Sequence, residues 1–316
     1  MSLNILIVDK AHPVLTYKLE GAGFCCETDL TITKDQFQQL EDKYVGLIIR
    51  SRFRLDAEAF DSKPNLKFVV RLGAGMENID VQYAESIGIK CMSTPEGNAP
   101  AVAQHCLGLL LNTLRCISES NLEVQEGLWL REKNKGRELS SLTIGIIGFG
   151  NTGNAFYNLL IPFNPRILVH DKYKTGFQKA GIEEASLDYL LEESDVISIH
   201  INYIPENYYF MNRTLFLKMK KAPILMNSSR GLVVNSSDLI EALNQKLVSK
   251  ANLDVVEFED VNLKIPPKSL WNSTLIQLAQ HKDVLITPHI AGQTLESELR
   301  HAEIAFQRID SLKLLD

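Results

Sequence analysis

Short apolar runs alternate with longer amphipathic segments along the whole chain, and this alternation limits the folds available to it. The runs read "NILIV", "VGLIIR", "LKFVV" and "IKCMS" in the first third, and "TIGIIG", "RILVH", "VISIH", "ILMNSS", "KANLDVV" and "DVLIT" further on. Continuous apolar runs separated by helix-length segments are typical of strands buried on both faces of a parallel sheet. The sequence therefore predicts an α/β protein.

The length of 316 residues favours two domains over one core. A long helix-like segment, "NAPAVAQHCLGLLLNTLRCIS", and the polar stretch "REKNKGRELSS" separate the first four runs from the other six. We therefore expect two Rossmann-like or flavodoxin-like doubly wound parallel-sheet domains with a cleft between them. Residues 1–97 with 288–316 form the first expected domain, and residues 98–287 form the second. The helical spacing of "LESELRHAEIAFQRIDSLKLL" predicts a closing helix that packs back on the first domain.

Composition excludes several classes of function. The 33 basic and 39 acidic residues give a net charge of −6, which argues against a nucleic-acid surface. No apolar run approaches the ~18 residues of a membrane span, and "MSLNILIVDK" lacks the features of a signal peptide. The five cysteines include no Cys-x-x-Cys pair, which suggests reduced thiols. We expect a cytoplasmic protein that binds neither membrane nor nucleic acid, and we expect no metal site.

A glycine pattern follows one strand directly and precedes a helix. In "TIGIIGFGNTGNAF", Gly148, Gly150 and Gly153 stand in Gly-x-Gly-x-x-Gly order. The pattern alone is a weak signal because glycine-rich turns are common, but its position between strand and helix strengthens it. A tight turn at Gly148, a close approach of backbone to pyrophosphate at Gly150 and close helix packing at Gly153 would make a dinucleotide site at a helix N-terminus.

Asp171 ends the next run, "RILVHD", 18 positions after Gly153. An acid at this place can accept hydrogen bonds from the adenosine ribose and repels a 2′-phosphate, so NAD is favoured over NADP. Lys172 and Lys174 lie close by and weaken that preference. The alternative is a solvated aspartate in a turn. We predict NAD as the cofactor.

Three ionisable residues follow later strands of the second domain: Arg230 in "ILMNSSRGLVV", Glu259 in "NLDVVEFED" and His289 in "TPHIAG". An open α/β sheet binds its ligands at the carboxyl ends of its strands. Each residue alone has an ordinary structural interpretation. Arg230 could bind a helix end, Glu259 could be a solvated loop acid, and His289 could be a histidine with all its hydrogen bonds made inside the protein. The three together are harder to explain in that way.

Oxidation of an alcohol by hydride removal needs a base for the hydroxyl proton, and the usual pKa of histidine suits this task. We assign that role to His289, with Pro288 stiffening the backbone ahead of it. Glu259 would orient the imidazole and favour its protonated form. Arg230 would hold the carboxylate of a 2-hydroxy or 2-keto acid in a planar fork and polarise the carbonyl.

These motifs resemble the D-isomer-specific 2-hydroxyacid dehydrogenases over nearly the whole chain. "GFGNTG" with Asp171 looks like the family's cofactor fingerprint, "NSSRG" like its catalytic-arginine motif, and "TPHIAG" like its histidine motif; Glu259 stands five positions after Asp254, as the family's acidic partner does. The resemblance makes the second domain NAD-binding and the first substrate-binding. Further cofactor contacts that it implies are Asn151, Thr152, Ser229, Asp254 and Gly292.

In the first domain, "RLGAGMENID" is similar to a loop whose amides, here at Ala74 and Gly75, would bind the substrate carboxylate, with Asn78 and Asp80 stabilising the loop. "GNAPAVAQH" resembles the opening of the interdomain helix and adds Asn98 to the substrate contacts. The family also implies a homodimer and closure of the two domains over substrate. The chain departs from the family at Asn202 and Ile204, where Pro and Thr are usual, and at Gln104, where Glu is usual.

"IIRSRFRLD" brings Arg50, Arg52 and Arg54 together in an acidic protein. The order Arg50-Ser51-Arg52 looks like the phosphate-contacting loop of D-3-phosphoglycerate dehydrogenases within the family, and paired arginines suit a phosphate. The alternative is a solvated basic loop without a ligand. The chain has no further residues after the closing helix, so we expect none of the C-terminal regulatory domains that some of these enzymes carry.

Three functions remain open at this point. The sequence favours an NAD-dependent D-2-hydroxyacid dehydrogenase that oxidises 3-phosphoglycerate at its 2-hydroxyl for serine biosynthesis. A hydroxypyruvate or glyoxylate reductase would make the arginine cluster incidental. An NADH-sensing protein of the corepressor kind would keep the fold and use closure to recruit partners.

Overall fold

The computed structural model describes residues 3–177, 181–260 and 262–315. The chain forms two compact units. Unit 1 comprises residues 1–99, 260–264 and 293–316, and unit 2 comprises residues 100–259 and 265–292. Unit 2 continues through Gly292, past the boundary expected at residue 287, because hydrogen bonds join residues 287–291 to Asp254.

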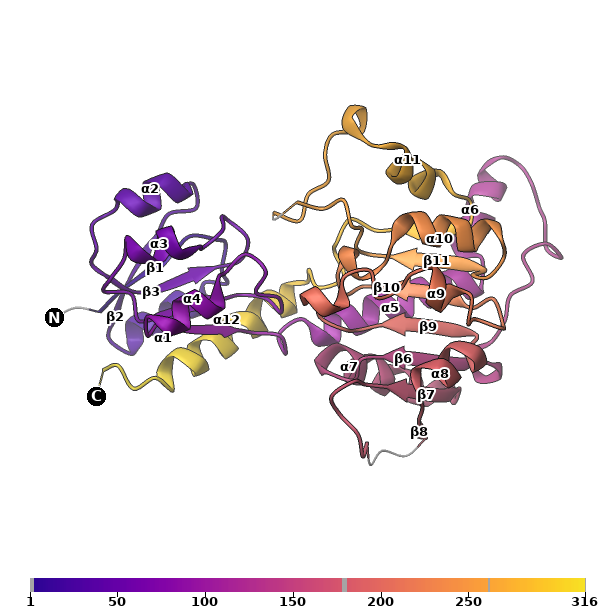
Figure 1. The fold of residues 1–316 in the computed structure, drawn as a ribbon, viewed down its shortest axis with the longest axis horizontal. Helices are drawn as coiled ribbons and strands as arrows, with labels where there is room; N and C mark the ends of the chain where they lie inside the picture. Colours follow the sequence, from indigo (N-terminus) through magenta and orange to yellow (C-terminus); the bar gives the residue numbers. More distant parts are fainter. Residues whose placement is uncertain (1–2, 178–180, 261, 316) are drawn as a thin grey trace. The chain divides into compact units, whose positions relative to one another are not determined.

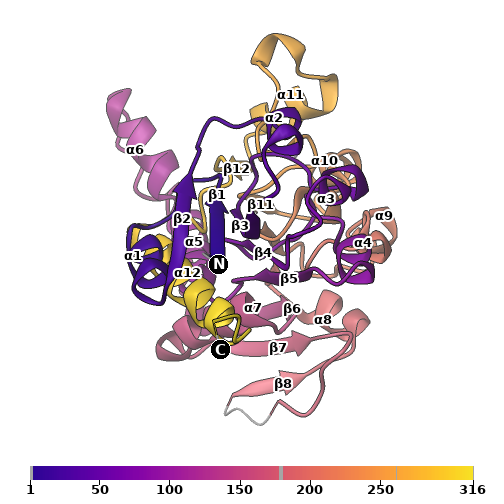
Figure 2. The same cartoon turned by 90° about the vertical axis from the view of Figure 1, so that its left-hand side faces the viewer.

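Unit 1 is built on a five-stranded parallel sheet with the order β2-β1-β3-β4-β5. Its strands are β1 (Leu3–Ile7), β2 (Phe24–Thr28), β3 (Tyr44–Ile49), β4 (Phe68–Arg71) and β5 (Lys90–Ser93). Its helices are α1 (Val14–Gly21), α2 (Lys34–Gln39), α3 (Ala57–Asp61), α4 (Val81–Ser86) and α12 (Leu295–Asp310). Helix α12 lies beside α1 in both views (Figures 1 and 2).

Successive residues of β1 point to opposite faces of this sheet, as the pleat requires. Ile5 and Ile7 pack in one hydrophobic cluster with side chains of α1 and α12, and Leu6 and Val8 pack in another with α2 and α3. The closing helix α12 therefore packs on the first sheet, as we expected. Its apolar stripe of Ala302, Ala305 and Ile309 supplies the contact.

Unit 2 contains a seven-stranded parallel sheet with the order β12-β11-β10-β9-β6-β7-β8 (Figure 1). Its strands are β6 (Thr143–Ile147), β7 (Arg166–His170), β8 (Ile182–Glu184), β9 (Val196–Ile199), β10 (Ile224–Asn227), β11 (Lys250–Leu253) and β12 (Val284–Ile286). The direction of winding reverses between β6 and β9, and ligands of doubly wound sheets bind at such a switch point. Both sheets are parallel, which confirms the predicted α/β class.

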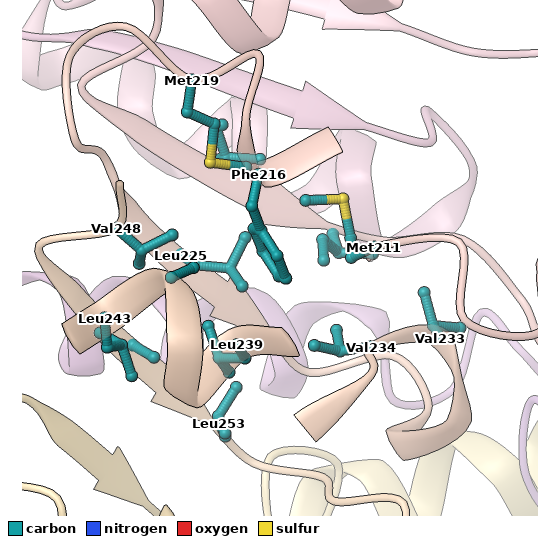
Figure 3. Close-up of a cluster of buried hydrophobic side chains, with 14 of the residues drawn as sticks. Met211, Phe216, Met219, Leu225, Val233, Val234, Leu239, Leu243, Val248 and Leu253 are labelled. Carbon is teal, nitrogen blue, oxygen red and sulfur yellow. The ribbon is translucent and has the colours of Figure 1, made fainter. Parts of the chain in front are cut away.

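Helices cover both faces of this second sheet. Cluster residues from α8 (Leu187–Glu193), α9 (Arg213–Phe216), α10 (Ser236–Asn244) and α11 (Ser273–Gln280) pack on one face. Figure 3 shows part of this cluster, in which Phe216 and Met219 lie near Leu225, and Leu239 lies near Leu253. Residues of α5 (Ala99–Leu114) and α7 (Asn151–Leu160) cover the other face. Short 3-10 turns span Leu139–Ser141, Ile161–Phe163, Pro205–Asn207, Gly231–Val233 and Lys268–Leu270.

The sequence did not predict two of the strands. In addition, the long helix-like segment expected between the two domains forms part of two helices. Strands β2 and β8 lie at sheet edges and are only partly buried, so they lack the continuous apolar runs that marked the central strands. The long helix-like segment breaks at Cys116, whose φ of 52° is left-handed, and α6 (Ile117–Gln125) follows. The side chain of Asn112 accepts the N–H and hydroxyl of Ser118 and stabilises this break.

Candidate active site

Arg230, Glu259 and His289 follow three neighbouring strands of unit 2, namely β10, β11 and β12. All three strands are parallel, so their carboxyl ends lie along the same edge of the sheet. The fold thus places the three predicted residues at the edge where doubly wound sheets bind ligands.

Glu259 and His289 are in direct contact. Oε2 of Glu259 lies 2.5 Å from Nδ1 of His289, and the two side chains are 13% and 20% exposed. The second oxygen of Glu259, Oε1, accepts the N–H of Val256 at 2.7 Å. The amide of Val256, in the same loop, therefore fixes the carboxylate that orients the imidazole. Nε2 is the ring nitrogen that faces away from Glu259.

The backbone of His289 is left-handed, with φ of 54°. Its N–H donates to the main-chain oxygen of Asp254 at 2.8 Å. The carboxylate of Asp254, expected to contact the cofactor, accepts the hydroxyl of Thr287 at 2.6 Å and the amides of Ile290 and Ala291 at 3.0 and 2.8 Å. Asp254 therefore binds the residues before and after His289, as well as the amide of His289 itself.

Arg230 sits in a turn that is organised by the buried amide of Asn227. The Asn227 side chain accepts the N–H and hydroxyl of Ser229 and donates to the main-chain oxygen of Arg230. Nη1 of Arg230 donates to the main-chain oxygen of Ser229 at 2.7 Å. Gly231 lies against the main chain of Val256, and a Cβ at this position would be 2.0 Å from the Val256 carbonyl. Glycine is required here for the arginine turn to approach the loop that carries Glu259.

The three glycines of the nucleotide loop have different surroundings. Gly148 has φ of 89°, and a Cβ there would lie 2.8 Å from the main-chain oxygen of His200. A Cβ on Gly153 would lie 2.1 Å from the oxygen of Gly148. A Cβ on Gly150, by contrast, would meet no protein atom within 4 Å. Two glycines thus serve the fold, and the third leaves open space at the start of α7.

This open space fits a pyrophosphate. Gly150 is the N-cap of α7 and provides no side-chain cap for the first turn, whose amides belong to Asn151, Thr152 and Gly153. Amides at a helix N-terminus attract phosphate oxygens. The start of α7 therefore has room for a phosphate beside its first-turn amides.

Asp171 follows β7, next to the glycine loop. Its Oδ2 accepts the N–H of Phe149 at 2.7 Å, and its Oδ1 accepts the amides of Tyr173 and Lys174 at 2.9 and 3.0 Å. The aspartate therefore ties the glycine loop to the turn after β7. Each carboxylate oxygen has two lone pairs, so these bonds leave capacity for a ribose hydroxyl.

The arginine loop of unit 1 is folded around Asp9. Oδ2 of Asp9 accepts the amides of Arg50, Ser51 and Arg52 at 2.7, 3.0 and 3.0 Å. The guanidinium of Arg52 donates from Nε to the oxygen of Val8 at 3.0 Å and lies 3.5 Å from Oδ1 of Asp9. The Arg52 side chain is thus engaged by β1 and Asp9.

The proposed carboxylate loop begins directly after β4. Ala74 is exposed and Gly75 is half-buried. Asn78 donates from Nδ2 to the oxygens of Arg50 and Phe53, so it connects this loop to the arginine loop. Asp80 caps α4 by accepting the N–H of Tyr83.

Two buried asparagine oxygens of unit 1 have no hydrogen-bond partner among the described residues. They are Oδ1 of Asn78 and Oδ1 of Asn98, the latter in the turn before α5. Buried polar atoms nearly always have a partner. A donor on a bound molecule would satisfy Asn98, which is one of the predicted substrate contacts.

A second basic group surrounds His301 in unit 1. The imidazole is buried, and its Nδ1 lies 2.7 Å from the hydroxyl of Thr94. Burial, together with the positive charges of Arg50, Arg71 and Arg300, lowers the pKa of His301 to about 4. Sequence patterns missed Arg71 and Arg300, because one belongs to a strand and the other to a helix distant in the sequence.

Other residues that shape the site were also missed, namely Asn227, Gly231, Thr287 and His105. Each stands inside or beside a motif that we had singled out, so the motif was the available signal. Nε2 of His105, in α5, lies 3.0 Å from the hydroxyl of Thr287. His200, which ends a predicted strand, is a structural histidine; it pairs with Ser198, and burial lowers its pKa to about 4.

No group of three or more His, Cys, Asp or Glu residues within the described ranges could hold a metal ion. In the same residues, no helix is both long and apolar enough to cross a membrane.

The doubly wound sheet, the glycine loop and the Glu259–His289 pair define a nucleotide-dependent dehydrogenase of the two-unit α/β class. The model of the D-isomer specific 2-hydroxyacid dehydrogenase NAD-binding domain matches residues 107–291. The chain belongs to this family, and it is an NAD-dependent oxidoreductase.

Individual relatives carry different names. A hydroxypyruvate reductase from Thermotoga maritima is 34% identical over 85% of this chain and 85% of its own length. A D-3-phosphoglycerate dehydrogenase from Archaeoglobus fulgidus is 32% identical over 94% of this chain, but the match spans 55% of that protein. The structure of a D-lactate dehydrogenase from Aquifex aeolicus, complexed with NAD and lactic acid, has a TM-score of 0.83 at 26% identity and covers 98% of this chain and 95% of its own.

Proposed function

We propose that this protein interconverts a D-2-hydroxy acid and its 2-keto acid, and that the pair is 3-phosphoglycerate and 3-phosphohydroxypyruvate. The contact between Glu259 and His289 supports the reaction, because it provides an oriented acid–base group. The basic group of Arg50, Arg71 and Arg300 in unit 1 supports the phosphorylated substrate. Bound NAD would accept the hydride from C2 of the hydroxy acid.

His289 takes the hydroxyl proton in the oxidation and returns it in the reduction. Because Nδ1 is held by Glu259, the proton moves at Nε2. The carboxylate of Glu259 stabilises the imidazolium that forms when the ring gains the proton. Val256 keeps the carboxylate from rotating away, since its amide binds Oε1.

Arg230 holds the keto-acid end of the substrate. A guanidinium offers two parallel N–H groups to a carboxylate and stabilises charge that develops on the carbonyl oxygen. The amides of Ala74 and Gly75 would provide further donors for the carboxylate, and the unpartnered Oδ1 of Asn98 would accept a substrate hydroxyl. The residues predicted to bind NAD, including Ser229, Asp254 and Gly292, keep that role in the proposal.

The phosphate would be bound by Arg50 together with Arg71 and Arg300. Arg52 is the weaker candidate of the predicted pair, because Asp9 and Val8 already engage its guanidinium. Arg71 donates from Nε to the oxygen of Arg50 at 3.1 Å, and Arg300 donates from Nε to the oxygen of Gly97 at 2.8 Å. These bonds fix the position of both side chains.

A hydroxypyruvate or glyoxylate reductase is the second candidate. The hydroxypyruvate reductase of Thermotoga maritima matches 85% of both chains, which favours this activity. The bonded state of Arg52 also fits a substrate without phosphate. A corepressor-like NADH sensor would show cofactor binding with no turnover.

The test is a panel of phosphohydroxypyruvate, hydroxypyruvate, glyoxylate and pyruvate, with NADH oxidation followed by absorbance. The proposal expects the highest kcat/KM for phosphohydroxypyruvate. Arg50→Ala and Arg300→Ala should reduce that value at least about tenfold more than the value for hydroxypyruvate, since each removes a charged hydrogen bond to phosphate. Arg54→Ala, at an exposed position of the same loop, is the matched control. Equal losses on both substrates would favour the reductase.

The protein is expected to act as a homodimer in the cytoplasm. The α6 segment of unit 2 supports the dimer, because it exposes the large apolar side chains Ile117, Leu122, Val124, Leu128, Trp129 and Leu130. Figure 2 shows α6 standing out from the rest of unit 2. Several large apolar side chains exposed on one short segment are typical of a protein interface. The five cysteines are all free thiols, which fits a reducing compartment.

A further inference from the structure

Asp254 carries a fully buried carboxylate at the end of β11, with a side chain that is 0% exposed. Three donors from the histidine segment satisfy it: the hydroxyl of Thr287 and the amides of Ile290 and Ala291. A buried carboxylate that lost a donor would be costly. The position of the segment therefore depends on these bonds.

Thr287 connects Asp254 to a residue outside the segment. Its hydroxyl has one hydrogen, which points to Oδ1 of Asp254 at 2.6 Å. Nε2 of His105 lies 3.0 Å from the same hydroxyl oxygen. Because the threonine proton is already used, Nε2 of His105 must carry a hydrogen and donate it. A directed chain thus runs from His105 to Thr287 and on to Asp254, whose Oδ1 also lies 3.5 Å from Nε2 of His105.

His289 needs such support because its backbone is left-handed. This conformation costs about 1 to 2 kcal/mol for a residue with a Cβ, so the segment would relax if its bonds weakened. The N–H of His289 donates to the oxygen of Asp254, directly beside the carboxylate that Thr287 binds. The chain of contacts from α5 therefore ends at the residue whose side chain meets Glu259.

The neighbouring side chain of α5 makes a parallel contact. Sγ of Cys106 lies 3.0 Å from the hydroxyl of Ser228, in the turn that carries Arg230. Consecutive residues of one helix thus contact the arginine turn and the histidine segment. Helix α5 is a common support for both.

We propose that His105 is a positioning residue for His289, acting through the hydroxyl of Thr287 and the carboxylate of Asp254. The assignment rests on the proposed function for the role of His289 in proton transfer. The contacts alone support the inference that His105 fixes the conformation of the 287–291 segment. A histidine that merely filled space in unit 2 would affect folding and leave the His289 ring in place.

Three variants separate these roles in kinetics. His105→Leu removes the donor, His105→Gln keeps an N–H at the place of Nε2, and Thr287→Val removes the hydroxyl with little change of shape. We expect His105→Leu and Thr287→Val to lower kcat about 10- to 100-fold through misplacement of His289. Tm should stay nearly unchanged in His105→Leu and fall in Thr287→Val, which leaves the buried carboxylate of Asp254 without one of its donors. His105→Gln should recover most of kcat. Gln104→Leu, at the exposed neighbour on α5, is the matched control and should behave as wild type.

A second readout does not depend on turnover. In protein labelled with ¹⁵N-histidine, the seven histidines give few ring signals, and His289→Gln identifies one of them. The His289 signal should shift or broaden in His105→Leu and Thr287→Val and remain in place in His105→Gln and Gln104→Leu. If no substrate is turned over, the proposed function fails while this measurement still tests the positioning role. An unchanged His289 signal in His105→Leu, or equal kcat for the Leu and Gln variants, would overturn the proposal.

Discussion

Oε2 of Glu259 and Nδ1 of His289 lie 2.5 Å apart, although 30 positions separate the two residues in the chain. The pair is mostly buried, and the other oxygen of Glu259 is bound by Val256. This geometry fixes which ring nitrogen of His289 is bound to the acid.

Glu259→Gln should keep the side-chain shape and remove the negative charge that stabilises the imidazolium. We expect kcat for keto-acid reduction to fall about 10²-fold, because the imidazole loses its oriented partner. NADH affinity, measured by the quenching of protein fluorescence, should stay within about twofold of wild type. Glu206→Gln, at an exposed position of unit 2, serves as the control. A Glu259→Gln enzyme with wild-type kcat would show that the pair is only structural.

The glycines of the nucleotide loop should respond in opposite ways to alanine. Gly153→Ala places a Cβ 2.1 Å from the oxygen of Gly148, so it should lower Tm by several degrees. Gly150→Ala meets no protein atom within 4 Å, so Tm should hold while NADH affinity falls about tenfold or more. Thermal unfolding and NADH titration of both variants provide the check. Unchanged NADH affinity in Gly150→Ala would mean that the pyrophosphate does not approach this glycine.

Gly231→Ala should damage both stability and catalysis. Its Cβ would overlap the Val256 carbonyl and approach the Glu257 amide at 2.5 Å, so the arginine turn and the acid loop must separate. We expect a loss of about 3 kcal/mol in the free energy of unfolding, measured by urea titration, and a fall in kcat. Gly176 is a left-handed glycine with no protein atom within 4 Å of an added Cβ, so Gly176→Ala measures the cost of backbone strain without crowding. Wild-type stability in Gly231→Ala would contradict the close approach.

Stability should fall in acid because of two buried histidines. The pKa values of His200 and His301 are lowered from 6.5 to about 4 in the folded protein, mainly by burial. Between these values the unfolded chain binds more protons, so the free energy of unfolding decreases as pH drops from 6.5 towards 4. At pH ~5 each histidine should cost about 2 kcal/mol relative to pH ~8. His200→Gln with His301→Asn should flatten the dependence in urea titrations, and an unchanged slope would contradict the assignment.

Much of the fold followed from the sequence because central parallel strands are buried on both faces. The apolar runs located ten strands, and the spacing after "TPHIAG" located α12. The edge strands β2 and β8 were not predicted, because half-exposed strands carry polar side chains and have no continuous apolar run. The break at Cys116 escaped because a left-handed residue leaves no mark in hydrophobic spacing.

The candidate site was predictable only as far as motifs extend. The motifs named Arg230, Glu259 and His289, and the structure brings Glu259 to His289. The partners that hold them, Asn227 and Thr287 within the motifs and His105 in α5, depend on three-dimensional contacts. His105 lies 182 positions from Thr287, so local patterns could not connect the two.

Turnover and cofactor binding by His289→Gln test the central claim most directly. Both would be measured on the same preparation, with NADH and the best substrate of the keto-acid panel. If His289 exchanges the substrate proton, kcat should fall about 10²- to 10⁴-fold while NADH binds as it does to wild type. A variant that keeps its turnover, or one that loses NADH binding together with its fold, would contradict the acid–base role of His289.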